Sequence, residues 1–423
     1  MEIELVKDYL SSYLKRKIPP LVKRELEIRP ISNKAVAIIG PRRAGKTSLM
    51  WQIISNYDRT KTIYLDFEDI ALRGLSAAEV LRIITEIFTE ISGSEANAIF
   101  LDEVQNLTDW QSLIRTLLDR GYVVFVTGST SKLLSREITT QLRGRSASFL
   151  LLPFSFREFL LAKKEDIASY SLSGIGKLKH LLLNYLEFGG YPEIVLGKSD
   201  KEKLLEEYKE LIFLKDFVDR EKIKSIDVAR FIFSFVTQCF SSEMSARNVL
   251  KALEERKVPF GRNTVYDYVE KLQDTMIFFF LDKYSPEIRL RTSWPRKVYL
   301  VDMGLAWRLP YDRGRLIENA VFLELKRRQK LSPLSEIYYY RDRNDREVDF
   351  LIKNGENVTG LIQVTYASNK HDLREGEVKN LVAASKELRC NNLLVITWDY
   401  EAEEKVNGKK IKFVPLWKWL LNL

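Results

Sequence analysis

The chain has few of the residues on which several common kinds of site depend. Its 423 residues include only two cysteines, Cys239 and Cys390, and only two histidines, His180 and His371. A disulfide scaffold is excluded because the two cysteines lie far apart in the sequence. With so little histidine, neither a histidine-rich zinc site nor a Ser-His-Asp triad is expected.

Long apolar runs are also missing. No run approaches the ~18 apolar residues that span a bilayer, and Ile277–Leu281 is only a short, core-like run. The N-terminal sequence MEIELVKDYL is charged and amphipathic, which argues against a signal peptide. We therefore expect a cytoplasmic protein without a membrane partner.

The charge is basic but not concentrated in one part of the chain. Lys and Arg number 67 against 58 Asp and Glu, a formal net charge of +9. The basic and acidic counts are 22 and 19 in residues 1–160, 24 and 21 in 161–300, and 21 and 18 in 301–423, so each part carries +3. No basic tail exists, and an anionic partner has to be sought at local patches.

Between Ala35 and about Leu152, short apolar runs alternate with helical stretches. Continuous apolar strands of this kind predict a parallel sheet covered by helices on both faces. The fold class expected is therefore α/β. The five runs are AVAIIG (35–40), TIYLDF (62–67), AIFLDE (98–103), YVVFVTG (122–128) and SFLLLP (148–153).

The first strand leads into a complete phosphate-binding motif, G-x-x-x-x-G-K-[ST], over residues 40–47. Glycines let the backbone curl around a phosphate chain, and the helix that follows adds its positive N-terminal end. Lys46 is predicted to reach the β- and γ-phosphates, and the Thr47 hydroxyl to bind Mg²⁺. ATP and Mg²⁺ are the expected cofactors. The predicted nucleotide-binding residues are Gly40, Pro41, Arg42, Arg43, Ala44, Gly45, Lys46, Thr47 and Ser48.

An acidic pair, Asp102 and Glu103, ends the apolar run of AIFLDEVQNL. Asp102 is predicted to hold the Mg²⁺ through water, opposite the Thr47 hydroxyl, and Glu103 to polarise the attacking water. The alternative is that the pair simply caps a helix. The phosphate-binding motif about 55 residues earlier favours the catalytic interpretation.

Two later segments supply further candidates for the same site. The run YVVFVTGST is expected beside the strand that bears Asp102, so that Thr127, or Ser129 close behind it, holds the water or the γ-phosphate; the alternative is a plain turn. In QLRGR, Arg143 and Arg145 are candidate arginine fingers that would complete a neighbouring copy's site in a homo-oligomer. A structural or substrate-facing arginine is an equal alternative.

Several segments together resemble a known family. They are GPRRAGKTSL, YLDFED (64–69), IFLDEVQNL, VTGSTSKLLS, LRGRSASFLLLPFSFREFL, FGGYPE (188–193), VDMGL (301–305) and REVDFLI (346–352). Over nearly its whole length the chain resembles archaeal and bacterial AAA+-like P-loop ATPases that carry a C-terminal domain of unknown function.

The resemblance implies four parts. They are an AAA+-like ATPase core over 1–160, a helical lid or linker over 161–225, a winged-helix unit over 226–297 and a restriction-endonuclease-like domain over 298–423. The sequence of residues 226–297 agrees with a winged-helix unit. It predicts two helices separated by a turn, MSARNVLKALEER and Asn263–Gln273, followed by the strand-like IFFFLDKY. Helix, turn, helix and strand is the winged-helix order.

The winged-helix unit offers candidate DNA contacts at two places. One is the start of its second helix, and the other is the segment RLRTSWPRK (289–297), which has four cations and no acid. The predicted contacts are Arg262, Asn263, Thr264, Arg289, Arg291, Arg296 and Lys297. Winged helices also bind proteins, and Asp267 and Glu270 on the second helix leave that alternative open.

The C-terminal domain contains part of a nuclease-like site. Nucleases of this type need a helix carboxylate, an Asp at a strand start and a Glu or Gln followed two residues later by Lys. Glu318 or Glu324, Asp349 and Gln363 fit the first positions, but Thr365 stands where the lysine belongs. We therefore expect a degenerate, binding-only domain. Nearby cations are either a DNA-facing rim or a solvated helix end, namely Lys326, Arg327, Arg328 and Lys330.

The function predicted from the sequence is a Mg²⁺-dependent ATPase that binds DNA through its winged helix and nuclease-like domain. Two alternatives remain open at this point. One is an ATP-regulated protein-interaction switch that binds no DNA. The other is an ATP-gated, metal-dependent DNA nuclease.

Overall fold

The computed structural model describes residues 2–129, 142, 144–165, 172–197, 199–256, 259–286, 295–310, 312–329 and 334–423. The chain forms two compact units, Met1–Pro153 and Phe154–Leu423. In the described ranges, no helix is long and apolar enough to cross a membrane.

The first unit is built on a five-stranded sheet in the order β2-β3-β4-β1-β5, in which every neighbouring pair is parallel. The strands are β1 (Ala35–Ile39), β2 (Thr62–Asp66), β3 (Ala98–Asp102), β4 (Val123–Gly128) and β5 (Ser146–Leu150). The first four follow the predicted apolar runs closely, and β5 begins two residues earlier than predicted. The α/β class is thus confirmed.

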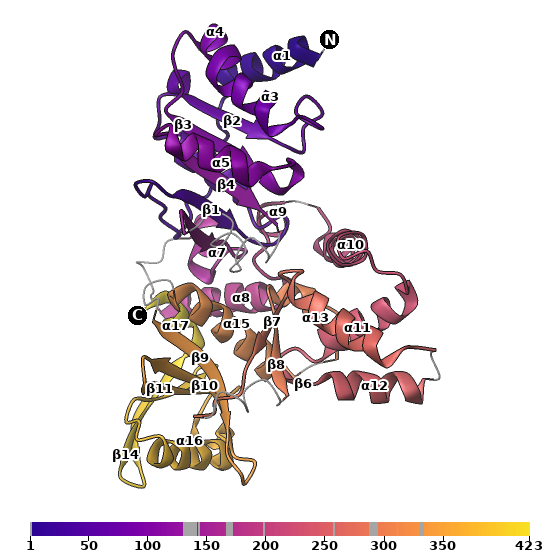
Figure 1. Ribbon diagram of the computed structural model, residues 1–423. Helices are drawn as coiled ribbons and strands as arrows, with labels where there is room; N and C mark the ends of the chain where they lie inside the picture. Colours follow the sequence, from indigo (N-terminus) through magenta and orange to yellow (C-terminus); the bar gives the residue numbers. More distant parts are fainter. Residues whose placement is uncertain are drawn as a thin grey trace. The chain divides into compact units, whose positions relative to one another are not determined.

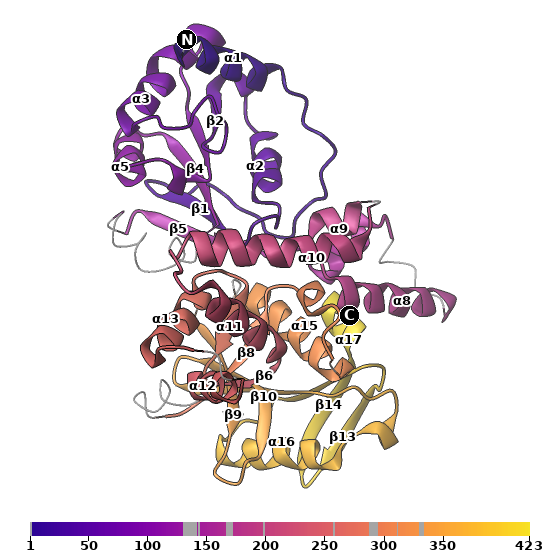
Figure 2. The same cartoon turned by 90° about the vertical axis from the view of Figure 1, so that its right-hand side faces the viewer.

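Helices cover both faces of this sheet, which explains why its strands are apolar on both sides. Figure 2 shows α2 on one side of the sheet and α3 and α5 on the other. A π-helical stretch, Ile83–Ile87, joins α3 to α4. The helices are α1 (Glu2–Lys15), α2 (Lys46–Ile54), α3 (Ala77–Arg82), α4 (Phe88–Ser92) and α5 (Trp110–Asp119).

The second unit starts with a helical stretch interrupted at two glycines. Gly189 has φ +77°, and a Cβ there would lie 1.6 Å from Oδ1 of Asp302, so only glycine fits. Asp302 Oδ2 accepts the N–H of Gly190 at 2.7 Å, and its Oδ1 accepts that of Gly304 at 2.9 Å. The segments FGGYPE and VDMGL therefore meet. The helices are α7 (Phe156–Ala162), α8 (Leu172–Phe188), α9 (Pro192–Leu196) and α10 (Lys201–Leu211).

The middle of the second unit combines three helices with a small antiparallel sheet of order β6-β8-β7. The predicted helix at 263–273 is present as α13, and a strand follows it as predicted. The predicted part boundary at 297 falls inside β8. The elements are α11 (Ile226–Gln238), β6 (Ser242–Met244), α12 (Ala246–Glu255), α13 (Arg262–Gln273), β7 (Phe278–Leu281) and β8 (Arg296–Leu300).

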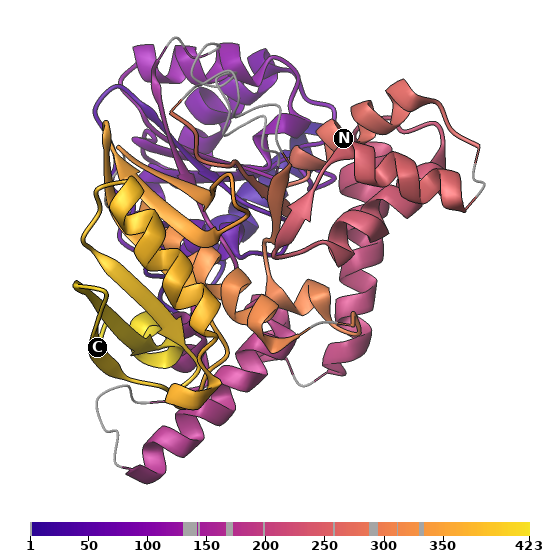
Figure 3. The same cartoon turned by 90° about the horizontal axis from the view of Figure 1, so that it is seen from below.

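The last third of the chain forms a mixed six-stranded sheet of order β13-β14-β12-β11-β10-β9. Figure 1 shows α15 and α17 on one side of it, and Figure 3 shows α16 lying across the other. The core between α16 and the sheet includes Leu381 of the helix and Val348, Leu361 and Phe413 of the strands. The elements are α15 (Arg313–Arg328), β9 (Ser335–Arg341), β10 (Glu347–Asn354), β11 (Asn357–Val364), α16 (Glu375–Glu387), β12 (Leu393–Thr397), β13 (Ala402–Val406), β14 (Lys409–Pro415) and α17 (Leu416–Leu421).

Candidate functional site

The phosphate-binding loop runs from the end of β1 to the start of α2, as predicted. A Cβ on Gly40 would lie 2.1 Å from the Leu151 carbonyl oxygen, so this position requires glycine. Gly45 adopts φ +95° as the residue before the first turn of α2. The buried Lys46 ammonium donates to the carbonyls of Gly40 and Pro41, both at 3.2 Å. The loop is therefore already folded around its lysine.

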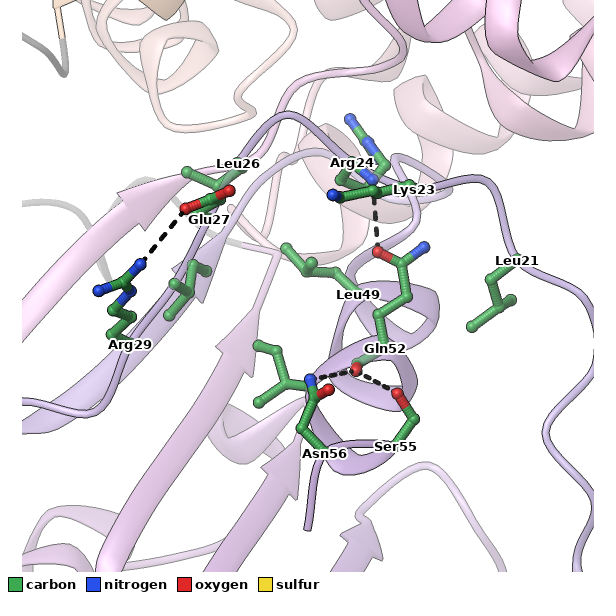
Figure 4. Close-up of a pocket in the computed structure, with 12 residues that line it drawn as sticks. Leu21, Lys23, Arg24, Leu26, Glu27, Arg29, Leu49, Gln52, Ser55 and Asn56 are labelled. Carbon is green, nitrogen blue, oxygen red and sulfur yellow. Dashed lines mark hydrogen bonds and ion pairs between the residues drawn. The ribbon is translucent and has the colours of Figure 1, made fainter.

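Arg24, which the sequence did not single out, supports this loop. Its buried guanidinium donates to the Ala44 carbonyl at 2.8 Å and to the Leu152 carbonyl at 2.6 Å. The segment that carries it runs along α2, where the side-chain oxygen of Gln52 accepts the Arg24 N–H at 3.3 Å (Figure 4). A groove of about 440 Å³ lies between this segment and α2, with Leu49 in its wall. The run KREL gives no sequence signal of such a role.

The strand order brings the predicted catalytic residues together, because β4 lies between β1 and β3. Asp102, at the end of β3, accepts the Thr47 hydroxyl at 2.7 Å on Oδ2. The Thr127 hydroxyl donates to Oδ1 of Asp102 and accepts the backbone N–H of Glu103 at 2.8 Å. Lys46, Thr47, Asp102, Glu103 and Thr127 thus form one cluster, and Ser129 is buried just beyond the end of β4.

Glu103 is held in an unusual conformation beside the P-loop lysine. Its backbone has φ +49°, which is uncommon for a residue with a side chain. Its Oε1 lies 3.2 Å from the Lys46 ammonium. Burial works to raise the pKa of this carboxyl, but the nearby Lys46 charge and hydrogen bonds from Gln105 and Lys46 bring the pKa below its ordinary value. Glu103 is therefore ionised at neutral pH and able to accept a proton.

A third hydroxyl, which the sequence did not single out, also contacts Asp102. The Tyr64 hydroxyl, on β2, donates to Oδ2 at 2.8 Å. Its ring packs against Trp51 of α2 at 4.9 Å between centroids and against Tyr13 of α1 at 6.2 Å. Burial and the charge of Asp102 raise the pKa of Tyr64, so it remains a donor. A tyrosine in a buried strand looks like core in the sequence.

One of the two predicted arginine fingers, Arg145, does not join its own chain's site. Arg145 lies at the start of β5, where its carbonyl accepts the N–H of Ala35 at the opposite end of β1 from the P-loop. Its guanidinium donates to Asp119 at 2.6 Å and to Asn33. Arg143 lies outside the described residues. A role for either arginine in a neighbouring copy stays a prediction.

Two groups of predicted DNA-contact residues have different surroundings. Arg262, 77% exposed, and the exposed Asn263 open α13, with Thr264 half-buried behind them. Arg296 is half-buried, with its guanidinium 4.8 Å from the centre of the Phe280 ring. Arg289 and Arg291 lie outside the described residues.

The structure contradicts the prediction that Lys297 contacts DNA. Its side chain is 3% exposed, because β8 is the central strand of the small sheet and its residues 297–300 are all buried. Its ammonium lies 2.9 Å from Glu318, 2.6 Å from Glu347 and 2.9 Å from Asp349. A cation enclosed by three carboxylates is not accessible to a phosphate backbone.

The predicted nuclease-like residues do meet in one place. Glu318, Asp349 and Gln363 line a pocket of about 280 Å³, which we call the C-terminal acidic pocket; Glu347 and Thr365 line it as well. Burial raises the pKa of Glu318 to about 7, although the Lys297 charge opposes the shift. Burial likewise raises the pKa of Asp349.

The other candidate helix carboxylate, Glu324, does not line this pocket. It is buried on α15, where Arg157 and Arg328 each donate to it at 3.0 Å. Arg328 also lies over the Trp419 ring, 4.0 Å from its centre, and Arg327 donates to the Phe154 carbonyl at 3.4 Å. These two arginines therefore hold α15 in place and are not part of a free DNA-facing rim. Lys330 lies outside the described residues.

Comparison with known families matches three stretches of the chain. Residues 32–160 match the AAA domain family, residues 179–313 a domain of unknown function (DUF8612) and residues 313–419 another (DUF4143). Among solved structures, similarity reaches Cdc6p from Pyrobaculum aerophilum, with a TM-score of 0.26 and 12% identity, covering 58% of this chain and 80% of that one. A signal-transduction ATPase with a tetratricopeptide repeat sensor from Pyrococcus horikoshii is similar with a TM-score of 0.24 and 13% identity. The match covers 77% of this chain and 45% of that one. At such TM-scores neither likeness bears on fold or function.

Relatives of known sequence cover the chain almost completely. An uncharacterised protein of Haemophilus influenzae is 24% identical over 394 residues, covering 90% of this chain and 93% of its own. An uncharacterised protein of Methanocaldococcus jannaschii is 35% identical over 430 residues, covering 99% of this chain and 95% of its own. The chain belongs to the family of this Methanocaldococcus jannaschii protein, with an AAA-type P-loop domain at residues 32–160.

Proposed function

We propose that the protein is a Mg²⁺-dependent ATPase that uses ATP binding and hydrolysis to change its engagement with DNA. The observation that carries the ATPase part is the convergence of Lys46, Thr47, Asp102, Glu103 and Thr127 at the carboxyl ends of adjacent parallel strands. Ligands bind at this edge in open α/β sheets.

The chemistry of each group suits phosphoryl transfer to water. The loop amides and Lys46 would bind the β- and γ-phosphates, so the Lys46–Glu103 ion pair has to open when the triphosphate enters. The oxygens of Thr47 and Asp102 are the hard ligands that Mg²⁺ prefers. Bound Mg²⁺ would neutralise charge that develops on the phosphates.

Glu103 would take a proton from the attacking water. As this happens, the water oxygen bonds to the γ-phosphorus, and the bond between the γ-phosphorus and the β,γ-bridging oxygen breaks. Thr127 would act through Glu103, because its hydroxyl fixes the backbone N–H of that residue. Both roles place the reacting water at the end of β3 and β4.

A direct test is ATP turnover by the Lys46→Ala variant. We expect turnover to fall by about 100-fold or more, because a fixed cation at the transferring phosphate is lost. Lys34→Ala removes an exposed lysine in front of β1 and is the matched control, with unchanged turnover expected. Unchanged turnover in Lys46→Ala would place the chemistry elsewhere.

The DNA-binding part of the proposal rests on the middle of the second unit. The order α11, β6, α12, α13, β7, β8 supports a winged helix in which α13 enters the major groove. Arg262 and Asn263 are exposed at the start of α13, where such helices contact base edges and phosphates. We propose that the nuclease-like domain contributes binding without cleavage.

Arg262→Ala tests this surface against Lys251→Ala, a control cation on α12 that is equally exposed at 79%. If Arg262 contacts a phosphate, its loss weakens duplex binding at every sequence and lowers the salt dependence by about one unit of slope. Binding by wild-type protein that does not weaken with added salt would oppose a phosphate-driven interface.

A protein-interaction switch is the second candidate, and one observation favours it. Tyr266 is 53% exposed on α13 and is flanked by the exposed acids Asp267 and Glu270. An exposed aromatic residue beside carboxylates suits a protein surface better than a phosphate backbone. If ATP turnover is intact while single-stranded, duplex and branched DNA neither bind nor change it, this second function replaces the first.

We also propose that the ATPase works as a homo-oligomer in which Arg143 or Arg145 acts on a neighbouring copy. Arg145 lies at the sheet end opposite its own P-loop, so it could act only in a neighbour's site. Sedimentation with and without a slowly hydrolysed ATP analogue tests assembly. Mixing Arg145→Ala with Lys46→Ala subunits then tests whether activity is restored between chains.

A further inference from the structure

The ammonium of Lys297 lies among the carboxylates of the C-terminal acidic pocket. It is within 2.9 Å of Glu318 Oε1, 2.6 Å of Glu347 Oε1 and 2.9 Å of Asp349 Oδ1. A lysine ammonium has three N–H donors and no acceptor, so these three oxygens satisfy it completely. Lys297 thus occupies the place where a cation bound by all three carboxylates would lie.

The remaining oxygen of Asp349 is also occupied by donors from the chain. Asp349 Oδ2 accepts the Gln363 side-chain N–H at 2.7 Å and the Val364 backbone N–H at 2.9 Å. A metal ion binds lone pairs and not N–H groups, so it would have to displace at least one of these donors. Since Asp349 is only 4% exposed, a displaced donor would be left buried.

Glu318 and Glu347 each have a second donor as well. The Tyr299 hydroxyl donates to Glu318 Oε1 at 2.7 Å. The Arg341 guanidinium donates to Glu347 Oε2. Among the described residues, no group of three or more histidine, cysteine or acidic side chains is arranged to hold a metal.

Gln363 presents the wrong atom for a metal ligand. Its Nε2 faces Asp349, as it must, because a carboxylate can only accept. Its Oε1 is buried and has no hydrogen-bond partner among the described residues, in a side chain only 6% exposed. The amide oxygen that would bind a metal is therefore turned away from the carboxylate that would share it.

We propose that Lys297 is the built-in cation of the C-terminal acidic pocket, and that it takes the place of a divalent metal ion there. The cation comes from β8 of the small sheet and not from position 365, where a metal-dependent nuclease of this type would carry its lysine. All three carboxylates are paired with Lys297 without a metal, so the domain carries out no metal-dependent cleavage of DNA. This inference is independent of the proposed ATPase.

The proposal is tested by Mn²⁺ binding to the full-length, nucleotide-free protein, followed by the Mn²⁺ paramagnetic resonance signal. Wild-type protein should bind no Mn²⁺ at this pocket. Lys297→Met removes the ammonium and keeps the apolar stem, so it should gain one Mn²⁺ per chain, at least about tenfold tighter than any wild-type binding. Adding Asp349→Asn to Lys297→Met should abolish the gained site, while any weak binding at the P-loop stays the same in all variants.

Wild-type protein that binds one Mn²⁺ and loses it on Asp349→Asn would overturn the proposal, as would Lys297→Met protein that binds none. Lys297→Met could fail to fold, because it leaves three buried carboxylates without a cation. Lys297→Met with Glu347→Gln carries one carboxylate fewer and serves as the second variant. The Mn²⁺ titration of wild-type protein tests the proposal even if neither variant folds. Cleavage of linear or branched DNA by wild-type protein with Mn²⁺, absent in Asp349→Asn, would also contradict it.

Discussion

Asp102 illustrates how much one carboxylate in the site depends on hydroxyl donors. Three hydroxyls meet it, from Thr47, Thr127 and Tyr64, each on a different element of the first unit. Thr47 would turn to the metal ion when nucleotide binds, which leaves Thr127 and Tyr64 to orient the carboxylate. Tyr64 is therefore a positioning residue, since it would act through Asp102.

Removing the Tyr64 hydroxyl should slow ATP turnover without preventing ATP binding. A hydrogen bond to a charged group contributes about 1.5–3 kcal/mol, so Tyr64→Phe should lower kcat by about tenfold or more. KM for ATP should change little. Tyr57→Phe is the control: its ring packs against Phe100, and its hydroxyl does not reach Asp102. Equal kcat values for the two variants would show that Tyr64 has no positioning role.

The residues of the nucleotide site were largely predictable from the sequence, because the P-loop motif follows β1 and the acidic pair ends β3, two parallel strands of one sheet. Tyr64 and Arg24 were not, since a tyrosine in an apolar strand and an arginine in an extended segment are ordinary core and surface patterns. Lys297 was misassigned: a run of cations suggested an exposed wing, but this lysine lies on β8, the central strand of the small sheet, where it is buried.

At the scale of elements, the packing of β1 against β5 depends on Gly40. The Leu151 carbonyl approaches so closely that any side chain at 40 would displace either β5 or the P-loop. The predicted run SFLLLP marked this strand but placed it two residues late, because the buried positions past Leu150 continue its apolar pattern beyond the last paired residue.

Gly40→Ala should therefore both destabilise the first unit and abolish ATP binding. We expect a loss of about 1–3 kcal/mol in the free energy of unfolding, seen as a lower melting temperature. Gly176→Ala, within α8, places its Cβ in open space and should raise stability by about 0.5–1 kcal/mol. A Gly40→Ala protein that melts and binds ATP like wild type would show that the close contact is absent.

A second junction between elements joins the α8–α9 break to η6 (Met303–Ala306) through Asp302. Burial raises the pKa of this carboxyl to about 7, against an ordinary value of 3.8, although the Gly190 and Gly304 N–H groups and Arg327 oppose the shift. Folded protein therefore keeps a proton there that unfolded chain releases. The stability due to this group is full below pH 3.8 and is lost as pH rises through 7.

Asp302→Asn should flatten this dependence, because an amide does not titrate. Between pH 4 and 7 the melting temperature of wild type should fall relative to that of the variant as the pH rises. Both proteins are compared at each pH, so other titrating groups such as Glu318 cancel. A constant difference across the range would mean that Asp302 keeps its ordinary pKa.

At the scale of the whole molecule, the evenly spread charge of +9 conceals local differences. One cation of the predicted wing, Lys297, neutralises internal carboxylates, and Arg327 and Arg328 hold α15. Arg262 remains 77% exposed, although its guanidinium lies 3.7 Å from Glu254, so the DNA surface we propose is smaller than the sequence suggested. Packing across the fold decides which cations stay exposed, and a single sequence does not reveal it.

The most direct test of the account is ATP turnover by Glu103→Gln beside wild type, with nucleotide binding measured on the same samples. We expect wild type to hydrolyse ATP, whereas Glu103→Gln should bind ATP at least as tightly and turn it over about 100-fold or more slowly, because the amide cannot take the proton of water. Turnover by Glu103→Gln equal to that of wild type would contradict it.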